Sequence, residues 1–273
     1  MKKISFTTLL GFLLGMGFIF AAMMESHRIE LFWNLPSVYM IIGGTFATLL
    51  TVFPPAKLKL FFPTMKRAFV HNKTDLRQDI ENIVELSKEV RSKGLMVLEN
   101  MAQQHIKDKF LYEALLLMAD GVNSEELKEH MEGVIYFTKK RHSKNAAMVD
   151  LVATVAPSLG LVGTYVGLIP MLSSLDDPTS LGPMMAIELV SSFYGGLLAN
   201  IVFGPIARRL KMIATEEADR NEFVLVGLLS IHEGKNPKMI ESNMMAYANL
   251  KSMKNGVDMD TGGKKQRRKS KAA

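Results

Sequence analysis

Polar side chains inside long apolar segments are the residues of this sequence that could do chemistry. Glu188 precedes Ser191 and Ser192 by three and four residues, so a helix would place all three on one face. A carboxylate inside a membrane span costs several kcal/mol unless it is paired or meets water, so Glu188 marks a functional hypothesis. The structural alternative is that Glu188 reaches water at the outer end of the span and that the serines bond their own backbone carbonyls.

Glycines recur at helical spacing in the preceding apolar segment. Gly163 and Gly167 form a G-x-x-x-G pair, and Gly160 lies close to the same face. Such faces let helices approach closely in a bilayer. The spacing therefore predicts a close-packed assembly in which these glycines pack against neighbouring subunits. Thr164 lies beside this face, and Tyr165 is expected to form an interhelical hydrogen bond.

The sequence offers little support for a catalytic site, a metal site or a nucleotide-binding site. The chain has no cysteine, so it has no disulfide, no thiolate metal site and no thiol nucleophile. Its six histidines show no metal-ligand spacing, and it has no phosphate-binding glycine loop. The sequence therefore predicts neither an enzyme nor a bound metal or cofactor.

Four uncharged apolar runs dominate the composition. The chain has 273 residues, of which 48% are hydrophobic and 22% are charged, and this predicts a protein that lies partly in a membrane and partly in water. Each run is long enough for a helix to cross a hydrocarbon core of roughly 30 Å. The first run is too long for a typical secretory signal, so we expect it to be retained. The predicted spans are residues 4–24, 31–56, 151–175 and 189–207.

Charge in the connecting segments predicts the orientation of these spans. Sixteen Lys or Arg residues lie between Lys57 and Lys144, whereas the two short loops at 25–34 and 173–182 together contain only Arg28. Positively charged loops stay in the cytoplasm, so both termini and the long middle segment are expected there. The net charge of +6 then says little about nucleic acid, and no nucleic-acid partner is expected.

The middle segment has the pattern of amphipathic helices. Leu76, Ile80, Ile83 and Val90 form a one-sided apolar stripe that Gly94 is expected to interrupt.

Two further helices are expected after this stripe. One should end at Gly121, and Asn123 with Glu126 predicts the start of the next. The apolar face of that last helix consists of Leu127, Met131, Val134 and Ile135.

The predicted fold class is an all-α membrane protein with four transmembrane helices, a helical cytoplasmic domain between spans 2 and 3, and a cytoplasmic C-terminal tail. Residues 1–56 would hold spans 1 and 2, and residues 57–146 the cytoplasmic domain. Residues 147–207 would hold spans 3 and 4, and residues 208–273 a helical segment with a basic, disordered tail.

The second half of the chain resembles a known family. Residues 156–211 resemble the third and fourth spans of the flagellar stator A subunits, the MotA and PomA family, through the glycine run and the motifs DDPTSLGP and FYGGLLAN. The resemblance extends to LPSVYMIIGGT in the second span and VRSKGLMVLE in the middle segment. The related TolQ and ExbB proteins share the paired channel helices but usually have three spans, so four spans favour the stator family.

The resemblance implies an ion-conducting stator subunit that couples proton or sodium flow to torque on the flagellar rotor. In such a stator, a ring of five A subunits surrounds the transmembrane helices of a B-subunit dimer of the MotB or PomB type. The B subunit anchors to peptidoglycan and supplies the aspartate that carries the ion. No cofactor beyond the transported H⁺ or Na⁺ is implied, and the expected location is the bacterial inner membrane.

The same resemblance assigns ion-path roles in spans 3 and 4. Pro157 matches the proline that faces the B-subunit aspartate, where its missing N–H kinks the helix and frees a carbonyl. Thr164 matches a threonine of the ion path, and Ser191 and Ser192 match a pair that carries hydroxyls mainly in sodium-driven members. Hydroxyl oxygens suit a small hard cation, so they favour sodium but leave the coupling ion open.

Three residues depart from the family pattern. Glu188 stands where alanine is usual, Asn34 stands where sodium-type members often have an acid, and Pro170 adds a second proline. We hypothesise that the outward-facing acid has moved from the first outer loop to Glu188, where it concentrates cations at the entrance. Asp150, seven residues before Pro157, either helps the ion to leave or marks the membrane boundary.

Two charges in the middle segment match the family's contact with the rotor. Arg91 and Glu99 correspond to the residues that engage charged side chains of the rotor protein FliG, although by themselves they would be ordinary solvated helix charges. The leading functional class is therefore an ion-driven stator. The alternatives are a TolQ- or ExbB-like energy transducer and a purely structural membrane protein.

Overall fold

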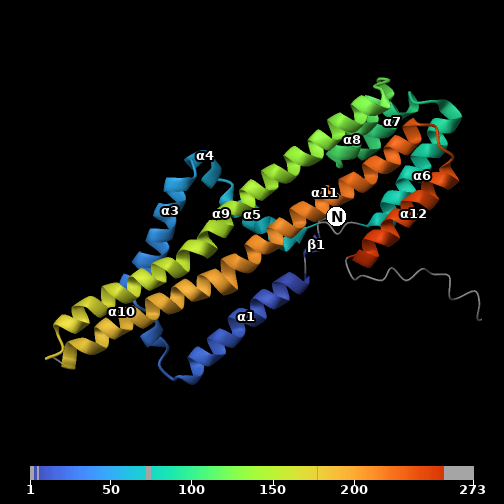
Figure 1. Ribbon diagram of the computed structural model, residues 1–273. Helices are drawn as coiled ribbons and strands as arrows, with labels where there is room; N and C mark the ends of the chain where they lie inside the picture. Colours follow the sequence, from blue (N-terminus) through green and yellow to red (C-terminus); the bar gives the residue numbers. More distant parts are fainter. Residues whose placement is uncertain (1–2, 5, 72–74, 177, 255–273) are drawn as a thin grey trace, which may run out of the picture. The chain divides into compact units, whose positions relative to one another are not determined.

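The computed structural model describes residues 3–4, 6–71, 75–176 and 178–254, and nearly all of them are helical (Figure 1). Four helical segments are long and apolar enough to cross a membrane, which confirms the four predicted spans and the all-α fold class. These segments are Thr7–Glu25, Ile29–Val52, Ser124–Ser173 and Leu181–His232.

The first two spans differ in regularity. The first is the single helix α1 (Phe6–Glu25), whereas the second is assembled from short pieces. Asn34 caps the start of the first α-helical piece, because its side chain accepts a hydrogen bond from the Ser37 N–H. Pro36 fits the first turn, because a backbone N–H there would have no partner within the helix. The pieces are the 3-10 helix η1 (Ile29–Phe32), α2 (Leu35–Val38), the π-helix η2 (Tyr39–Gly43) and α3 (Gly44–Val52).

The third and fourth spans are the apolar parts of much longer helices. α9 (Ser124–Ser173) has 50 residues, and neither Pro157 nor Pro170 ends it. The kink expected at Pro157 stays a prediction. α10 (Pro178–Leu197) leads through the π-helix η4 (Leu198–Phe203) into α11 (Gly204–His232). The predicted span boundaries therefore mark changes of hydropathy and not breaks in the backbone.

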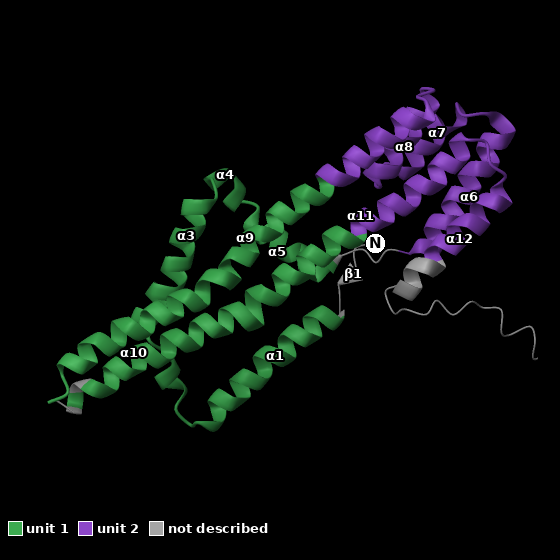
Figure 2. Ribbon diagram, viewed as in Figure 1, with its two compact units in different colours: residues 1–73, 138–216 green, residues 74–137, 217–273 purple. Residues whose placement is uncertain are grey.

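The chain forms two compact units (Figure 2). Unit 1 comprises residues 1–73 and 138–216, and unit 2 comprises residues 74–137 and 217–273.

Unit 1 contains the apolar helices together with small elements that precede unit 2 in the chain. α4 (Pro55–Leu58) and α5 (Phe61–Phe69) follow the second span. The strands β1 (Lys3–Ile4) and β2 (Val70–His71) pair antiparallel. Two-residue strands have no alternating pattern, so the sequence did not predict them.

Unit 2 is a set of helices around its own apolar core. The predicted stripes lie in this core, since Ile80 and Ile83 of α6 and Leu127, Met131 and Ile135 of α9 are all buried. Burial of these faces is the main source of its stability. The elements of unit 2 are α6 (Leu76–Lys93), α7 (Val97–Ala102), η3 (Gln103–His105), α8 (Lys109–Ala119), α12 (Pro237–Lys254) and parts of α9 and α11.

Capping residues set the helix ends of unit 2. Gly94 ends α6 with a φ of +80°, and Gly121 follows α8 with a φ of +79°, a conformation that glycine adopts without strain. Asn123 accepts a hydrogen bond from the Glu126 N–H at 2.8 Å where α9 begins. These three predicted helix boundaries are confirmed.

Candidate functional site

α9 and α10 pack backbone against backbone in unit 1. A Cβ atom placed on Gly167 would lie 2.7 Å from the carbonyl oxygen of Met184, and one placed on Gly195 would lie 2.6 Å from the carbonyl oxygen of Ala156. No side chain fits at these distances, so glycine is what allows the two helices to approach.

The predicted glycine face belongs to this contact. Gly160, Gly163 and Gly167 are all buried against α10 of the same chain, and a Cβ on Gly163 would lie 2.3 Å from the Cβ of Ser191. The prediction that these glycines pack against neighbouring subunits is therefore wrong. The G-x-x-x-G spacing indicates that a helix packs closely, but it does not indicate which chain supplies that helix.

Ser191 and Ser192 have different surroundings. Ser191 is fully buried, and its hydroxyl donates a hydrogen bond to the hydroxyl of Ser37 at 2.9 Å. Ser192 is exposed. Successive residues of a helix point about 100° apart, so neighbouring positions need not share a face. Only the Ser192 hydroxyl is open to an ion or to another chain.

Ser37 connects Ser191 to the start of α2. Its hydroxyl lies 2.9 Å from the Asn34 Oδ1 and 3.3 Å from the carbonyl oxygen of Ile187. Asn34 also caps α2, so this polar cluster fixes the beginning of the α-helical part of the second span against α10. The sequence did not single out Ser37. The Asn34–Pro36 helix start was a visible signal, but nothing local pairs residues that are 154 positions apart.

Of Glu188, Thr164 and Tyr165, which are also polar residues of the spans, only Thr164 forms a hydrogen bond with a described residue. Glu188 is partly buried beside Gly167, and its carboxylate forms no hydrogen bond or ion pair with any residue that the structure describes. The Thr164 hydroxyl donates a hydrogen bond to the Leu161 carbonyl oxygen at 2.7 Å. It is therefore bound to the backbone of its own helix and not to another side chain. Tyr165 is exposed and makes no hydrogen bond to the described residues, so the expected interhelical bond is not formed within the chain.

Pro157 and Asp150 lie farther toward the middle of α9. Pro157 is exposed, and its Cα lies beside Gly195 of α10. Asp150 forms an ion pair with Lys211 of α11, with 2.8 Å between Nζ and Oδ2. An exposed pair of this kind contributes about 0.2–1 kcal/mol. The structure thus gives Asp150 a partner in the chain and leaves Pro157 and Ser192 accessible.

Arg91 and Glu99 are exposed charges on unit 2. Arg91 lies in the last turn of α6 and Glu99 in the first turn of α7, and within the described residues neither forms an ion pair. Met96, between them, is 79% exposed. Both charges are therefore available to another protein, and their contact with a rotor stays a prediction.

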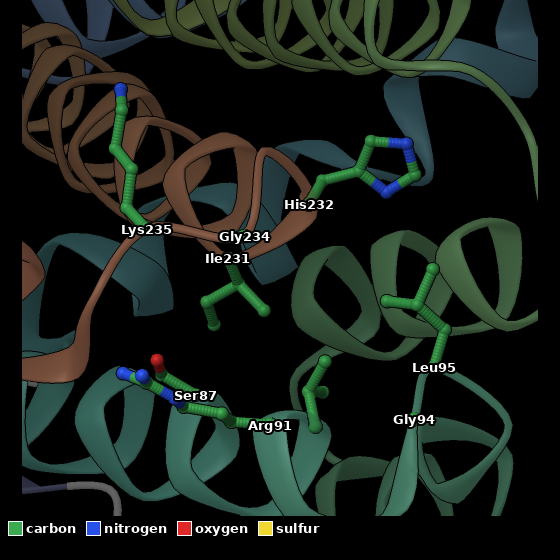
Figure 3. Close-up of a pocket in the computed structure, with 9 residues that line it drawn as sticks. Ser87, Arg91, Gly94, Leu95, Ile231, His232, Gly234 and Lys235 are labelled. Carbon is green, nitrogen blue, oxygen red and sulfur yellow. The ribbon is translucent and has the colours of Figure 1, made fainter.

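A pocket of about 270 Å³ lies next to Arg91 (Figure 3). One wall is the end of α6, with Ser87 and Arg91 one helical turn apart, and the other is the end of α11 with the turn that follows it, including His232 and Lys235. Gly234 allows this turn through a φ of +72°. The sequence did not suggest this pocket, because its walls come from distant segments.

Comparisons with known proteins agree with this architecture. Residues 102–222 match the MotA/TolQ/ExbB proton channel family. The chain is 34% identical to YtxD of Bacillus subtilis (strain 168) over 91% of its length and 92% of that protein. It is 32% identical to the chemotaxis protein PomA of Vibrio alginolyticus over 89% of its length and 94% of PomA.

A solved structure is similar over the same range. The flagellar MotAB stator complex from Bacillus subtilis superimposes with a TM-score of 0.81 at 27% identity, over 92% of this chain and 98% of that one. The sequence likeness, the four spans and the structural likeness lead to one assignment. The chain belongs to the MotA/TolQ/ExbB proton channel family.

Proposed function

We propose that this chain is the ion-conducting A subunit of a flagellar stator, which couples proton or sodium flow to torque on the rotor. The observation that carries the proposal is the likeness to PomA and to the MotAB stator complex over about nine-tenths of the chain. The four spans supply the membrane part that such a channel needs. An energy transducer of the TolQ or ExbB type shares the family but usually has three spans.

The proposed B-type partner would supply the ion-carrying carboxylate. Glu188 has no hydrogen-bond or ion-pair partner among the described residues, and it lies beside Gly167, ten residues after Pro157 on α9. The likeness to the MotAB stator complex supports a carboxylate near Pro157 that comes from another chain. We propose that it comes from a MotB- or PomB-type subunit enclosed by several copies of this chain, five by the family pattern, with both termini in the cytoplasm.

The accessible residues define the proposed ion path. Pro157 cannot donate a backbone hydrogen bond, which leaves a carbonyl of the preceding turn available to an ion. Ser192 offers a free hydroxyl, whereas Ser191 is occupied by Ser37. Glu188 would attract cations before they reach this region. Thr164 would contribute only if it releases the Leu161 carbonyl.

Torque requires a second site outside the membrane. The exposed Arg91 and Glu99 carry opposite charges without partners of their own among the described residues, which suits electrostatic contact with a rotor protein of the FliG type.

Complementation of motility tests the proposal. The chain would be expressed with the B-type subunit of the same genome in a flagellated host that lacks its own stators. Swimming should return and should depend on the sodium or the proton gradient, and replacing the B-subunit aspartate by asparagine should abolish it. Failure to restore swimming, together with rescue of an outer-membrane defect in a host lacking its own transducer, would favour the transducer alternative.

A further inference from the structure

The segment that follows the second span is basic and contains no acid. Residues 53–71, which include α4 and α5, carry four Lys or Arg residues and no Asp or Glu. Three of the four are exposed lysines that form no ion pair with a described residue. A basic cluster of this size next to a membrane span is typical of segments that bind anionic lipids. The four residues are Lys57, Lys59, Lys66 and Arg67.

α5 packs against the ends of two spans within unit 1 (Figure 2). Its Phe69 ring meets the ring of Phe12 edge to face, with 5.9 Å between the centroids, and Phe12 lies within two turns of the start of α1. Its Phe61 ring lies 6.2 Å from the ring of Phe203, near the predicted end of the fourth span. Ala68 is fully buried in an apolar cluster with residues of α9 and α11. α5 is therefore held at the boundary of the hydrocarbon region.

Two large apolar side chains beside these cations are exposed. Leu60 is 45% exposed and Phe62 is 77% exposed. This combination is typical of a segment that lies in the lipid headgroup layer, because the apolar groups enter the acyl boundary while the charges stay among the headgroups. If the lysines only oriented the spans, their charge would be explained but the exposure of Phe62 would not.

A hollow of about 30 Å³ lies between α5, α9 and α11. Its polar lining can donate hydrogen bonds from Arg67, Thr64, His142 and Asn145, and no carboxylate is among its described lining residues. The Arg67 guanidinium contacts the His142 ring, with 3.2 Å between Nη1 and Nε2. The side chains of Thr64 and Asn145 form no hydrogen bond with a described residue. The volume is that of about one water molecule, so the hollow can receive one oxygen atom of a phosphate.

The depth of the hollow matches the headgroup layer. Its apolar lining is Leu210 and Ile213 of α11, three and six residues past the predicted end of the fourth span at Ala207. At 1.5 Å per residue these side chains lie roughly 5–9 Å beyond that end, and the headgroup layer extends roughly 5–8 Å beyond the hydrocarbon core. The phosphate of a lipid can therefore reach the hollow.

We propose that this site binds an anionic phospholipid of the leaflet beside α5. Arg67 and the Thr64 hydroxyl would hold the phosphate, since a guanidinium forms strong charge-assisted hydrogen bonds with phosphate oxygens. The three lysines would attract the negatively charged leaflet, and Phe62 would enter the acyl boundary. The proposal goes beyond the stator function, because none of the proposed ion-path residues lines the hollow.

Native mass spectrometry of the complete stator complex in detergent tests this, because one spectrum counts both bound lipids and subunits. Phosphatidylglycerol, phosphatidylcholine and inorganic phosphate are titrated separately. Phosphatidylglycerol should saturate the site, and the other two should bind about tenfold more weakly. Arg67→Gln should weaken phosphatidylglycerol binding about tenfold and Lys59→Gln about fivefold. Arg77→Gln is the matched control, because Arg77 is an exposed arginine of unit 2 that does not line the hollow, and binding should not change.

Phe62→Ser distinguishes a lipid from a neighbouring subunit as the cover of this face. It should reduce lipid binding at an unchanged subunit count, whereas a loss of subunits would overturn the proposal and make the face a contact between copies of the chain. Equal binding of phosphatidylglycerol and phosphatidylcholine would also overturn it, as would displacement of phosphatidylglycerol by an equal concentration of inorganic phosphate.

Thr64→Val and Lys59→Gln decide the outcome if Arg67→Gln fails to assemble through loss of its contact with His142. Thr64→Val keeps the shape of the side chain and removes the hydroxyl, so it should weaken phosphatidylglycerol binding about fivefold. Parent-like binding by both variants would mean that the Arg67–His142 contact only joins α5 to α9 and that the hollow holds no lipid.

Discussion

Arg220 of α11 donates two hydrogen bonds to the carboxylate of Asp79 of α6. One runs from Nη2 to Oδ1 at 2.6 Å and the other from Nε to Oδ2 at 2.9 Å. The same guanidinium contacts the carboxylate of Asp108, which caps α8. Asp79 is buried, so its charge has little access to water. One arginine therefore ties three helices of unit 2 together.

Removal of Arg220 should destabilise unit 2. Arg220→Gln leaves Asp79 and Asp108 without their cation, and breaking a buried pair in this way costs about 3–5 kcal/mol. Hydrogen exchange of the α6 and α8 amides measures the loss locally. Glu222→Gln is the control, because Glu222 lies two residues away and is exposed. Equal protection in both variants would mean that the ion pairs contribute nothing to unit 2.

Gly195 and Gly196 should respond differently to alanine. A Cβ on Gly195 would lie 2.6 Å from the Ala156 carbonyl oxygen, whereas one on Gly196 would have nothing within 4 Å. Gly195→Ala should therefore push α9 and α10 apart and lower the stability by about 1–3 kcal/mol. The melting temperature of the complex in detergent checks this. Gly196→Ala should melt as the parent does, and a similar drop in both variants would refute the close contact.

Local patterns predicted the helices of this protein well. The α6 stripe, the turn at Gly94 and the helix start at Asn123 each depend on residues within about two turns, so the sequence carries them directly. The two-residue strand pair and the continuity of α9 beyond its apolar part have no such local signal.

Contacts between segments explain where the site predictions differ from the structure. The spacing of Gly163 and Gly167 is a property of one helix, and it could not tell α10 of the same chain from a second subunit. The adjacent positions of Ser191 and Ser192 predict one shared role, whereas in the fold the hydroxyl of Ser191 donates a hydrogen bond to Ser37.

The two serines should separate stability from ion dependence. Ser191→Ala removes a buried hydrogen bond, which should lower the stability by about 1 kcal/mol without changing which cation drives swimming. Ser192→Ala leaves the fold unchanged because that side chain is exposed, and it should shift the dependence of swimming speed on sodium concentration. The comparison needs melting curves and sodium titrations of both variants. If Ser191→Ala altered the sodium dependence at unchanged stability, the assignment of the two roles would be reversed.

Glu188 should affect the supply of cations and not the chemistry deeper in the path. Its carboxylate has no hydrogen-bond or ion-pair partner among the described residues. The α9 residue beside it is Gly167, which has no side chain that could pair with the carboxylate. Glu188→Gln preserves size and removes the charge, so a higher cation concentration should be needed for half-maximal swimming speed, with the maximal speed retained. The shift should shrink at high ionic strength, because salt screens an accessible charge. Glu30→Gln, at an exposed acid of η1, controls for a general change in surface charge. An unchanged cation dependence in Glu188→Gln would show that this acid has no part in collecting ions.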